Sequence, residues 1–264
     1  MKKPLILVTN DDGITSNGIK ELVQICQKIG EVVIVAPDSP QSGMGHAITI
    51  GESLRLDLVK DIFGESLAYT CSGTPADCVK LAKHLVLKDR KPDLVVSGIN
   101  HGSNTSISVL YSGTMSAAIE AAIEGIPAIG FSLCDYTAQA DFSHILTFVS
   151  EIIKQALQFG IPKSTALNVN FPNKRMGEVK GIKVCRQARA KWSEDFDERK
   201  DPHGRSYFWM TGEFINEDKG EDTDEYLISQ GYATIVPCAF DLTAHYGIAQ
   251  LNKDWNLQKV FNTH

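Results

Sequence analysis

The stretch LILVTNDDG, residues 5–13, decides how the rest of the chain is interpreted. Its continuous apolar run at residues 5–8 predicts a strand buried on both faces, which is typical of parallel sheets. Directly after the strand come two adjacent carboxylates, Asp11 and Asp12, and a glycine. Ligands of α/β proteins bind just beyond the carboxyl ends of the strands, so these two side chains are candidate ligand-binding groups.

The two carboxylates also indicate a bound cation. No Lys or Arg follows them until Lys20, so nothing close in the sequence neutralises their mutual repulsion. Hard divalent cations take oxygen ligands and keep coordination positions open for water and a substrate phosphate. We therefore expect one divalent metal ion, Mg²⁺ or Mn²⁺, in each subunit.

The composition is that of a globular protein. The 264 residues suffice for one large domain or for one domain with an appendage. The formal net charge of −6 argues against polymeric nucleic acid as the main partner, although it does not exclude mononucleotides. The short apolar run near residue 5 is too short for a signal peptide, and no stretch is long enough to cross a bilayer. We expect no membrane partner and a cytoplasmic location.

Up to about residue 135, short apolar runs alternate with amphipathic segments, which predicts a mainly parallel sheet with helices on both faces. Residues 48–69 differ, because they alternate apolar and polar side chains and predict added antiparallel strands or a hairpin. The six cysteines contain no CxxC pair, and we expect them to be buried, reduced thiols. The expected strands are residues 5–8, 32–36, 94–97, 128–132 and 167–170; the expected helices are residues 18–29, 74–87, 112–124 and 142–159.

The character of the chain changes after about residue 172. Residues 186–205 are rich in charged and aromatic side chains, and residues 207–210, YFWM, predict an exposed or partner-covered strand. The acidic run at residues 217–225 lacks the ligand spacing of an EF-hand and is predicted to be a solvated loop. We divide the chain into a catalytic core, residues 1–175, and an extension, residues 176–264, that makes oligomer contacts and covers the site.

Four segments rich in Gly, Ser, Asn and Asp follow predicted strands or begin predicted helices: residues 10–13, 36–46, 97–104 and 112–116. In a parallel sheet, loops after the strands converge on one edge. Together they offer an oxygen shell for a divalent cation from Asp11, Asp12, Ser42 and Asn100. Taken singly, each segment is also explained as an ordinary turn or helix cap.

The predicted phosphate site has an unusual charge distribution. Residues 36–50 and 97–120 contain no Lys or Arg, so positive potential must come from the metal, glycine amides and the N-terminus of the helix that begins at residues 112–114. The nearest titratable side chains are His46 and His101. His46 is explained equally well as a phosphate ligand, as a group that serves the leaving oxygen, or as a structural residue.

At these motifs the sequence resembles the SurE (survival protein E) family of metal-dependent nucleotidases, and the resemblance covers nearly the whole chain. The matching segments are ILVTNDDGI (6–14), APD (36–38) with Ser42 to His46, SGTPADCV (72–79), SGIN (97–100) with Gly102 and Asn104, SGT (112–114), and LNVN (167–170) with Pro172. Residues 186–192 and 207–212 resemble the C-terminal region of that family.

The resemblance implies a Rossmann-like α/β core with a C-terminal extended hairpin that is exchanged in a homodimer or homotetramer. It implies hydrolysis of nucleoside 5′-monophosphates, with 3′-monophosphates and short polyphosphate as further substrates. By residue-by-residue transfer, the metal ligands are Asp11, Asp12, Ser42 and Asn100. The phosphate-binding residues transferred in the same way are Asn104, Ser112, Gly113 and Thr114. Asp11 and Asp12 are the catalytic candidates, and Asp12 is the preferred group to orient or deprotonate the attacking water.

Two other classes of protein compete with this interpretation. A haloacid-dehalogenase-type phosphatase needs an aspartate nucleophile where this chain has Asn10, and a carboxamide is a poor nucleophile. A non-catalytic nucleotide-binding regulatory protein would share the fold, because such folds host both roles. NAD binding is disfavoured, since no GxGxxG follows the first predicted strand. Trp192, Tyr207 and Trp209 either stack a base or pack a subunit interface, and packing is favoured.

Overall fold

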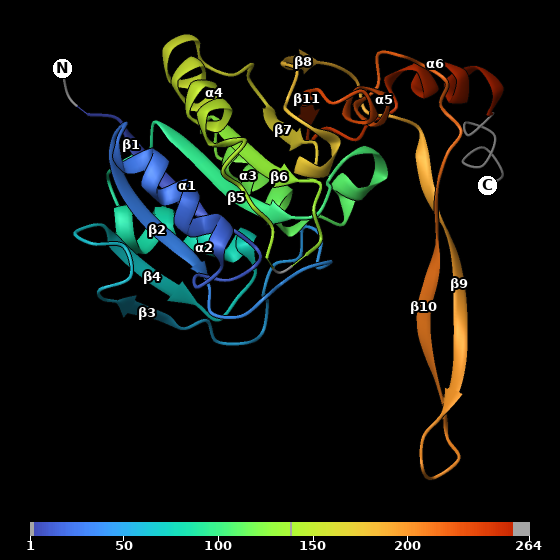
Figure 1. Cartoon of the computed structure of the whole chain (residues 1–264), viewed down its shortest axis with the longest axis horizontal. Helices are drawn as coiled ribbons and strands as arrows, with labels where there is room; N and C mark the ends of the chain where they lie inside the picture. Colours follow the sequence, from blue (N-terminus) through green and yellow to red (C-terminus); the bar gives the residue numbers. More distant parts are fainter. Residues whose placement is uncertain (1–2, 138, 256–264) are drawn as a thin grey trace, which may run out of the picture.

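The protein is a nine-stranded mixed sheet flanked by helices, with a separate two-stranded hairpin, in a computed structural model that describes residues 3–137 and 139–255 (Figure 1). The order across the large sheet is β3-β4-β2-β1-β5-β6-β7-β11-β8. The strands are β1 (Leu5–Thr9), β2 (Glu31–Pro37), β3 (Leu56–Val59), β4 (Leu67–Cys71), β5 (Leu94–His101), β6 (Ala128–Leu133), β7 (Thr165–Phe171), β8 (Ile182–Val184), β9 (Ala190–Lys200), β10 (Ser206–Asn216) and β11 (Ala233–Ala239).

Helical segments connect most of these strands. The α-helices are α1 (Asn17–Gln27), α2 (Pro75–Leu81), α3 (Gly113–Ile123), α4 (Leu146–Phe159), α5 (Asp224–Ser229) and α6 (His245–Asp254). Shorter or irregular turns are η1 (Ala82–Leu87), η2 (Ser106–Leu110) and η3 (Lys174–Met176). No helix in the described ranges is long and apolar enough to cross a membrane.

The centre of the sheet is parallel, as the continuous apolar strands predict. β1 pairs in parallel with β2 and β5, and β2–β4, β5–β6 and β6–β7 are parallel as well. β3 is antiparallel to β4, which confirms the expected antiparallel addition within residues 48–69. At the other edge β11 is antiparallel to β7.

Strand β1 is buried on both faces because alternate side chains enter two separate cores. Ile6 and Val8 pack in the core that includes buried residues of α1 and α4, whereas Leu5 and Leu7 pack with those of α2 and α3. The period of two along the strand therefore distributes apolar surface to both layers of helices. This arrangement confirms the α/β fold expected from the sequence.

Two predicted helices differ in detail from the structure. α4 begins at Leu146 rather than at residue 142, because Phe142 and Ile145 fold into a turn whose side chains are buried in the core. The predicted helix at residues 74–87 becomes α2 followed by a π-helical turn, η1. Its predicted start is confirmed: the Thr74 hydroxyl accepts from the backbone N–H of Asp77 at 3.2 Å, and the Asp77 carboxylate accepts from the N–H of Thr74 at 2.9 Å.

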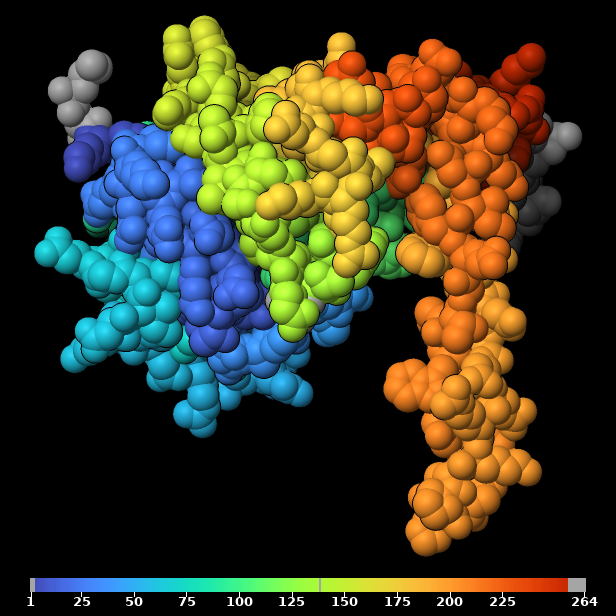
Figure 2. Space-filling view, viewed as in Figure 1, coloured from blue at the N-terminus to red at the C-terminus, as the bar shows by residue number. Residues whose placement is uncertain are grey.

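The C-terminal part contributes both to the sheet and to a projecting arm. β8 and β11 extend the same sheet that holds β1, so the division at residue 175 stays a prediction about function and assembly. β9 and β10 form a long hairpin that stands away from the body (Figures 1 and 2). In the half of the hairpin that is farther from the body, Phe196, Phe208, Trp209 and Met210 are exposed.

Candidate functional site

The candidate site lies where the direction of strand addition reverses. From β1 the chain adds β2 and β4 on one side, and it then returns to place β5, β6 and β7 on the other side. The carboxyl ends of β1 and β5 therefore form the switch point at which parallel α/β sheets bind ligands. Asp11 and Asp12 follow β1, and Asn100 lies near the end of β5.

A direct contact joins these two strand ends. The backbone N–H of His101 donates to Oδ2 of Asp12 at 3.3 Å, and Thr9 pairs with Ser97 in the β1–β5 register. The side-chain amide of Asn100 donates from Nδ2 to the backbone oxygen of Gly102 at 2.9 Å. This bond orients the Asn100 side chain and leaves its Oδ1 as the atom suited to a hard cation.

Asp11 is almost completely buried, with 4% of its surface exposed, and it contacts the start of helix α3. The Thr114 hydroxyl donates to Oδ1 of Asp11 at 2.5 Å. Burial, followed by the neighbouring charge of Asp12, raises the pKa of Asp11 to about 6. Two adjacent carboxylates in such surroundings are stabilised by a cation, which is what the sequence predicts for this position.

The N-terminus of α3 approaches Asp11 so closely that glycine is needed. A Cβ atom at Gly113 would lie 2.6 Å from Cβ of Asp11 and 2.9 Å from its Oδ2. Ser112 is the N-cap, and its hydroxyl accepts from the backbone N–H of Met115 at 3.0 Å. The first-turn N–H groups of a helix have no intrahelical acceptor, so this terminus can receive an anion beside the carboxylates.

The loop that contains Ser42 is tied to the same place at both ends. The backbone N–H of Gln41 donates to the oxygen of Asp11 at 2.7 Å, and that of Gly45 donates to the oxygen of Tyr111 at 3.1 Å. Ser42 itself is exposed. The structure thus brings all four predicted loops to one edge of the sheet, as their positions after the strands indicate.

Asn104 lies in a buried polar network that the sequence did not reveal. Its Nδ2 donates to Oγ of Ser132 at 2.8 Å, and its backbone N–H donates to Oδ1 of Asn170 at 2.9 Å. Asn168 donates to the backbone oxygen of Asn104 at 2.8 Å. The two asparagines of β7 thereby fix the loop after β5, which gives the LNVN segment a structural role.

The donor set fits a hard cation. Apart from the two carboxylates it consists of a hydroxyl and an amide, and residues 3–137 and 139–255 contain no group of three or more His, Cys, Asp or Glu side chains that could hold a metal. Oxygen ligands with few protein charges suit Mg²⁺ or Mn²⁺, which retain water molecules, rather than a zinc ion in a closed protein cage.

His46 reaches the site from the loop after β2 and bonds to a residue that sequence reasoning missed. Its Nε2 lies 3.0 Å from Oε2 of Glu120, and Oε1 of Glu120 accepts from Nζ of Lys80 at 2.5 Å. His46 lines a cavity of about 600 Å³ together with Ser112 and Ser116. His101 instead bonds through Nδ1 to the backbone oxygen of Thr137 at 3.1 Å.

The segment predicted as a solvated acidic loop is in fact partly buried, so that prediction is wrong for its last third. Thr223 and Asp224 have 0% exposure, and Asp224 accepts from the backbone N–H groups of Ser106 at 2.8 Å and Ala188 at 2.9 Å. An acidic residue is buried here because it caps backbone donors. These bonds join the C-terminal part to the turn that follows β5.

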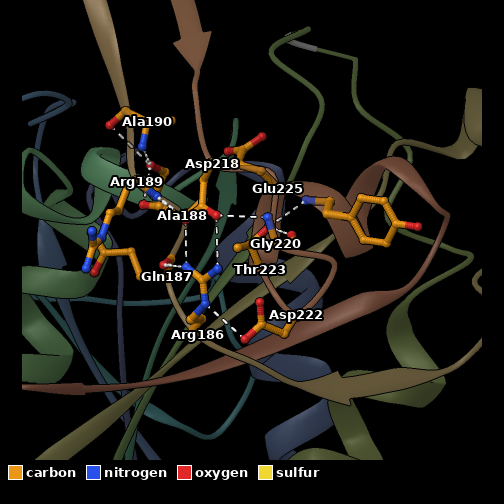
Figure 3. A network of polar contacts seen from close by, with 12 residues as sticks. Arg186, Gln187, Ala188, Arg189, Ala190, Asp218, Gly220, Asp222, Thr223 and Glu225 are labelled. Atoms are coloured by element: carbon orange, nitrogen blue, oxygen red, sulfur yellow. Dashed lines mark hydrogen bonds and ion pairs between the residues drawn. The ribbon is translucent and has the colours of Figure 1, made fainter.

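Arg186 is the centre of a second polar cluster (Figure 3). Its Nη1 and Nη2 donate to the two carboxylate oxygens of Asp218 at 2.6 and 2.9 Å, and its Nε donates to Asp222 at 2.9 Å. The bidentate geometry fixes the guanidinium, and Arg186 lines the same cavity as His46. Sequence reasoning noted Arg186 only as part of a charged segment.

The structure is that of an α/β protein, and the acidic, oxygen-rich residues at the switch point of its parallel sheet form a candidate ligand site. The chain belongs to the survival protein SurE family, because the sequence model of that family matches residues 6–194. This result confirms the resemblance seen in the motifs.

Individual relatives agree with this assignment. The chain is 68% identical to the 5′-nucleotidase SurE of Cytophaga hutchinsonii over 97% of this chain and 98% of the relative. It is 59% identical to the 5′-nucleotidase SurE of Flavobacterium psychrophilum over 98% of this chain and all of the relative. The crystal structure of the SurE protein from Aquifex aeolicus superposes with a TM-score of 0.81 at 39% identity, covering 95% of this chain and 99% of that one.

Proposed function

We propose that this protein is a divalent-metal-dependent 5′-nucleotidase that hydrolyses nucleoside 5′-monophosphates to nucleoside and phosphate. The class of reaction is supported by full-length relatives that bear the name 5′-nucleotidase. The single observation that carries the mechanism is the contact between Asp11 and the N-terminus of α3 at Gly113 and Thr114. It brings a carboxylate for a cation and a helix terminus for a phosphate to the same point.

In this proposal Asp11, Asp12, Ser42 and Asn100 hold the cation. A bound divalent cation would supply charge neutralisation at the phosphate and would make water at the site more acidic. Among the described residues, the one hydrogen bond that Asp12 accepts is a long bond of 3.3 Å from the backbone N–H of His101, so its carboxylate retains capacity to orient the attacking water and take its proton.

The phosphate would lie at the start of α3. Ser112, Gly113 and Thr114 offer their backbone N–H groups. The Thr114 hydroxyl already donates to Asp11, whereas the Ser112 hydroxyl accepts from the N–H of Met115 and keeps its own O–H for a phosphate oxygen. Asn104 has one N–H of its amide bonded to Ser132 and a second one that remains for a phosphate oxygen.

The metal requirement has a direct test. We expect Asp11→Asn to lower kcat/KM for AMP at least about a hundredfold, or about 2.7 kcal/mol of transition-state stabilisation, and to weaken binding of Mn²⁺ measured by calorimetry. Asp141→Asn is the matched control, because Asp141 is a carboxylate paired with Lys174 on the surface. Full turnover after exhaustive EDTA treatment would contradict the metal requirement.

The proposal extends to further substrates and to location. Activity toward 3′-AMP and short polyphosphate is measured with the same phosphate-release assay, and the identical Asp11→Asn loss is expected if one site serves all of them. A cytoplasmic location, to be tested by cell fractionation, belongs to the proposal as well.

The projecting hairpin supports a homodimer or homotetramer. Large apolar side chains on an arm away from the body mark protein contacts, and Met210 at 71% and Phe208 at 59% exposure lie on this arm. We expect light scattering to show a multimer, and we expect replacement of residues 195–211 by a short turn to lower its mass. An unchanged mass would remove the hairpin from the assembly.

The two competing interpretations make different predictions. In place of a nucleophile, Asn10 has an amide that donates to the backbone oxygen of Gly13 and to Oγ of Ser16, both at 2.9 Å, so it stabilises the turn. A trapped aspartyl-phosphate would therefore contradict the proposal. Measurable AMP binding without turnover under any metal would favour a regulatory nucleotide-binding protein.

A further inference from the structure

Glu120 is a buried acid that the proposed reaction does not yet use. It lies on α3 with 3% of its surface exposed, further along the same helix whose first turn is the proposed phosphate site. Its two carboxylate oxygens have different partners, Nε2 of His46 at 3.0 Å and Nζ of Lys80 at 2.5 Å. A buried carboxylate is costly unless it is paired, and here the two pairing groups fix the Glu120 carboxylate in one orientation beside His46.

We propose that Glu120 positions His46 as the proton donor to the 5′-oxygen that leaves the phosphate. This inference rests on the proposed nucleotidase function and adds to it a positioning residue and the identity of the general acid.

The geometry fixes which nitrogen of His46 would donate the proton to the leaving 5′-oxygen. Because the Glu120 carboxylate accepts from Nε2, the ring keeps a proton on Nε2. Nδ1 is then the nitrogen that is left for a substrate. Within the described parts of the chain, no hydrogen bond to Nδ1 of His46 is formed. The ring lines the cavity that also contains Ser112, so its free edge shares a space with the proposed phosphate site.

The backbone holds His46 at this place as well. The neighbouring Gly45 is bonded to Tyr111, directly before the N-cap Ser112. Three residues further along, the backbone N–H and hydroxyl of Thr49 both bond to Asp77 on α2. The loop is therefore anchored on both sides of His46, which limits the movement of the ring relative to α3.

Glu120 places a negative charge beside the His46 ring. Burial would raise the pKa of Glu120, but hydrogen bonds from His46 and Lys80 lower it, so Glu120 is an anion at neutral pH. Lys80 from α2 pairs with Glu120, and Arg186 from the segment after β8 lines the same cavity as His46 but is already paired with two aspartates. Glu120 is thus the anion that accepts from the imidazole ring in this cavity.

The proton-transfer step balances without any further reactant. As the bond from the attacking water oxygen to phosphorus forms, the bond from phosphorus to the 5′-oxygen breaks, and the leaving oxygen keeps the electron pair. That oxygen takes the proton from Nδ1 of His46 and leaves as the nucleoside hydroxyl. The proton that the attacking water gives up returns to the imidazole through solvent, so the residue is regenerated.

The decisive test compares leaving groups. A nucleoside 5′-oxygen is strongly basic and needs a proton donor, whereas p-nitrophenolate leaves without one. We expect His46→Gln to lower kcat for AMP about a hundredfold while kcat for p-nitrophenyl phosphate changes less than about threefold. An equal loss on both substrates would show that His46 is structural, and an unchanged kcat for AMP would remove it from the reaction.

Glu120→Gln tests the positioning role, and Glu124→Gln is its matched control. Glu124 is the C-cap of the same helix and pairs with Lys83 in η1, directly after α2; within the described residues it forms no hydrogen bond to a histidine. We expect Glu120→Gln to lower kcat for AMP about tenfold with little change in KM. Loss of the anion leaves Lys80 beside the ring, so the alkaline fall of kcat should move to lower pH by about one unit.

Failure of this inference is distinct from failure of the nucleotidase proposal. If the wild-type protein releases no phosphate from AMP with any divalent metal, the proposed function is wrong. If the wild type is active but Glu120→Gln and Glu124→Gln change the pH profile equally, or not at all, only the positioning role is overturned.

Discussion

Gly113→Ala is the substitution whose effect follows most directly from the geometry of the site. In an exposed helix this change stabilises, because glycine costs up to about 1 kcal/mol relative to alanine. At residue 113 the new methyl group would lie 2.6 Å from Cβ of Asp11 and 3.1 Å from its Cγ. Carbon atoms pack at about 3.5–4.0 Å, so either Asp11 or the first turn of α3 must move by about 1 Å.

The expected loss follows from that displacement. Moving catalytic groups by about 1 Å costs on the order of a hundredfold in rate, so kcat/KM for AMP should fall about a hundredfold, or about 2.7 kcal/mol. Overpacking should also lower the free energy of unfolding by about 1–3 kcal/mol. The expected loss of stability is opposite in sign to the prediction from helix propensity alone.

The assay is phosphate release with saturating Mn²⁺, together with thermal unfolding of the same preparation. Gly247→Ala in α6 is the matched control, because among the described residues its new methyl group would meet only Cβ of Ala244, at 3.8 Å. We expect that control to retain full activity and to be at least as stable as the wild type. A Gly113→Ala protein that is as active and stable as the wild type would refute the argument that α3 contacts Asp11.

Two further predictions concern stability and thiol chemistry. Asp224→Ala removes the acceptor for the backbone N–H groups of Ser106 and Ala188, so the free energy of unfolding in urea should fall by about 2–4 kcal/mol. The control Asp222→Ala, at an exposed carboxylate, should lower it by less than about 1 kcal/mol, and equal losses would contradict the capping role of Asp224. Burial raises the pKa of the Cys26 thiol to about 12, so iodoacetamide at pH 8 should modify Cys26 in urea but not in the native protein, and labelling of the native protein would show that the thiol is not buried.

The central sheet could be predicted because its strands carry a simple signal. Residues 5–8 are apolar throughout, and that pattern is stable only when both faces are covered. The start of α2 was predictable for a local reason as well, since Thr74 and Pro75 favour a helix N-terminus and Asp77 completes the cap.

Elements that depend on distant contacts were not predictable in the same way. Residues 142–145 have helical spacing, but tertiary packing of Phe142 and Ile145 places them in a turn. Asp224 lies in an acidic run whose local sequence indicates solvent exposure, and only the backbone donors of Ser106 and Ala188 explain its burial.

The candidate site also has some features that the local sequence predicts and others that depend on distant contacts. The loops that bear Asp11, Ser42, Asn100 and Gly113 could be placed together because they follow strands of one parallel sheet. Glu120 could not be connected with His46 from the sequence, since the two are 74 residues apart and only the packing of α3 against the loop after β2 joins them. The sequence motifs predict which loops meet, whereas the contact between His46 and Glu120 required the structure.

The most direct test of the account is phosphate release from AMP by the purified protein, with Mn²⁺ or Mg²⁺ and after EDTA, for the wild type and Asp12→Asn. The account predicts release that requires the metal, returns when metal is restored after EDTA, and falls at least about a hundredfold in Asp12→Asn. Release that persists in EDTA, or wild-type rates in Asp12→Asn, would contradict a metal-dependent nucleotidase site at the carboxyl end of β1.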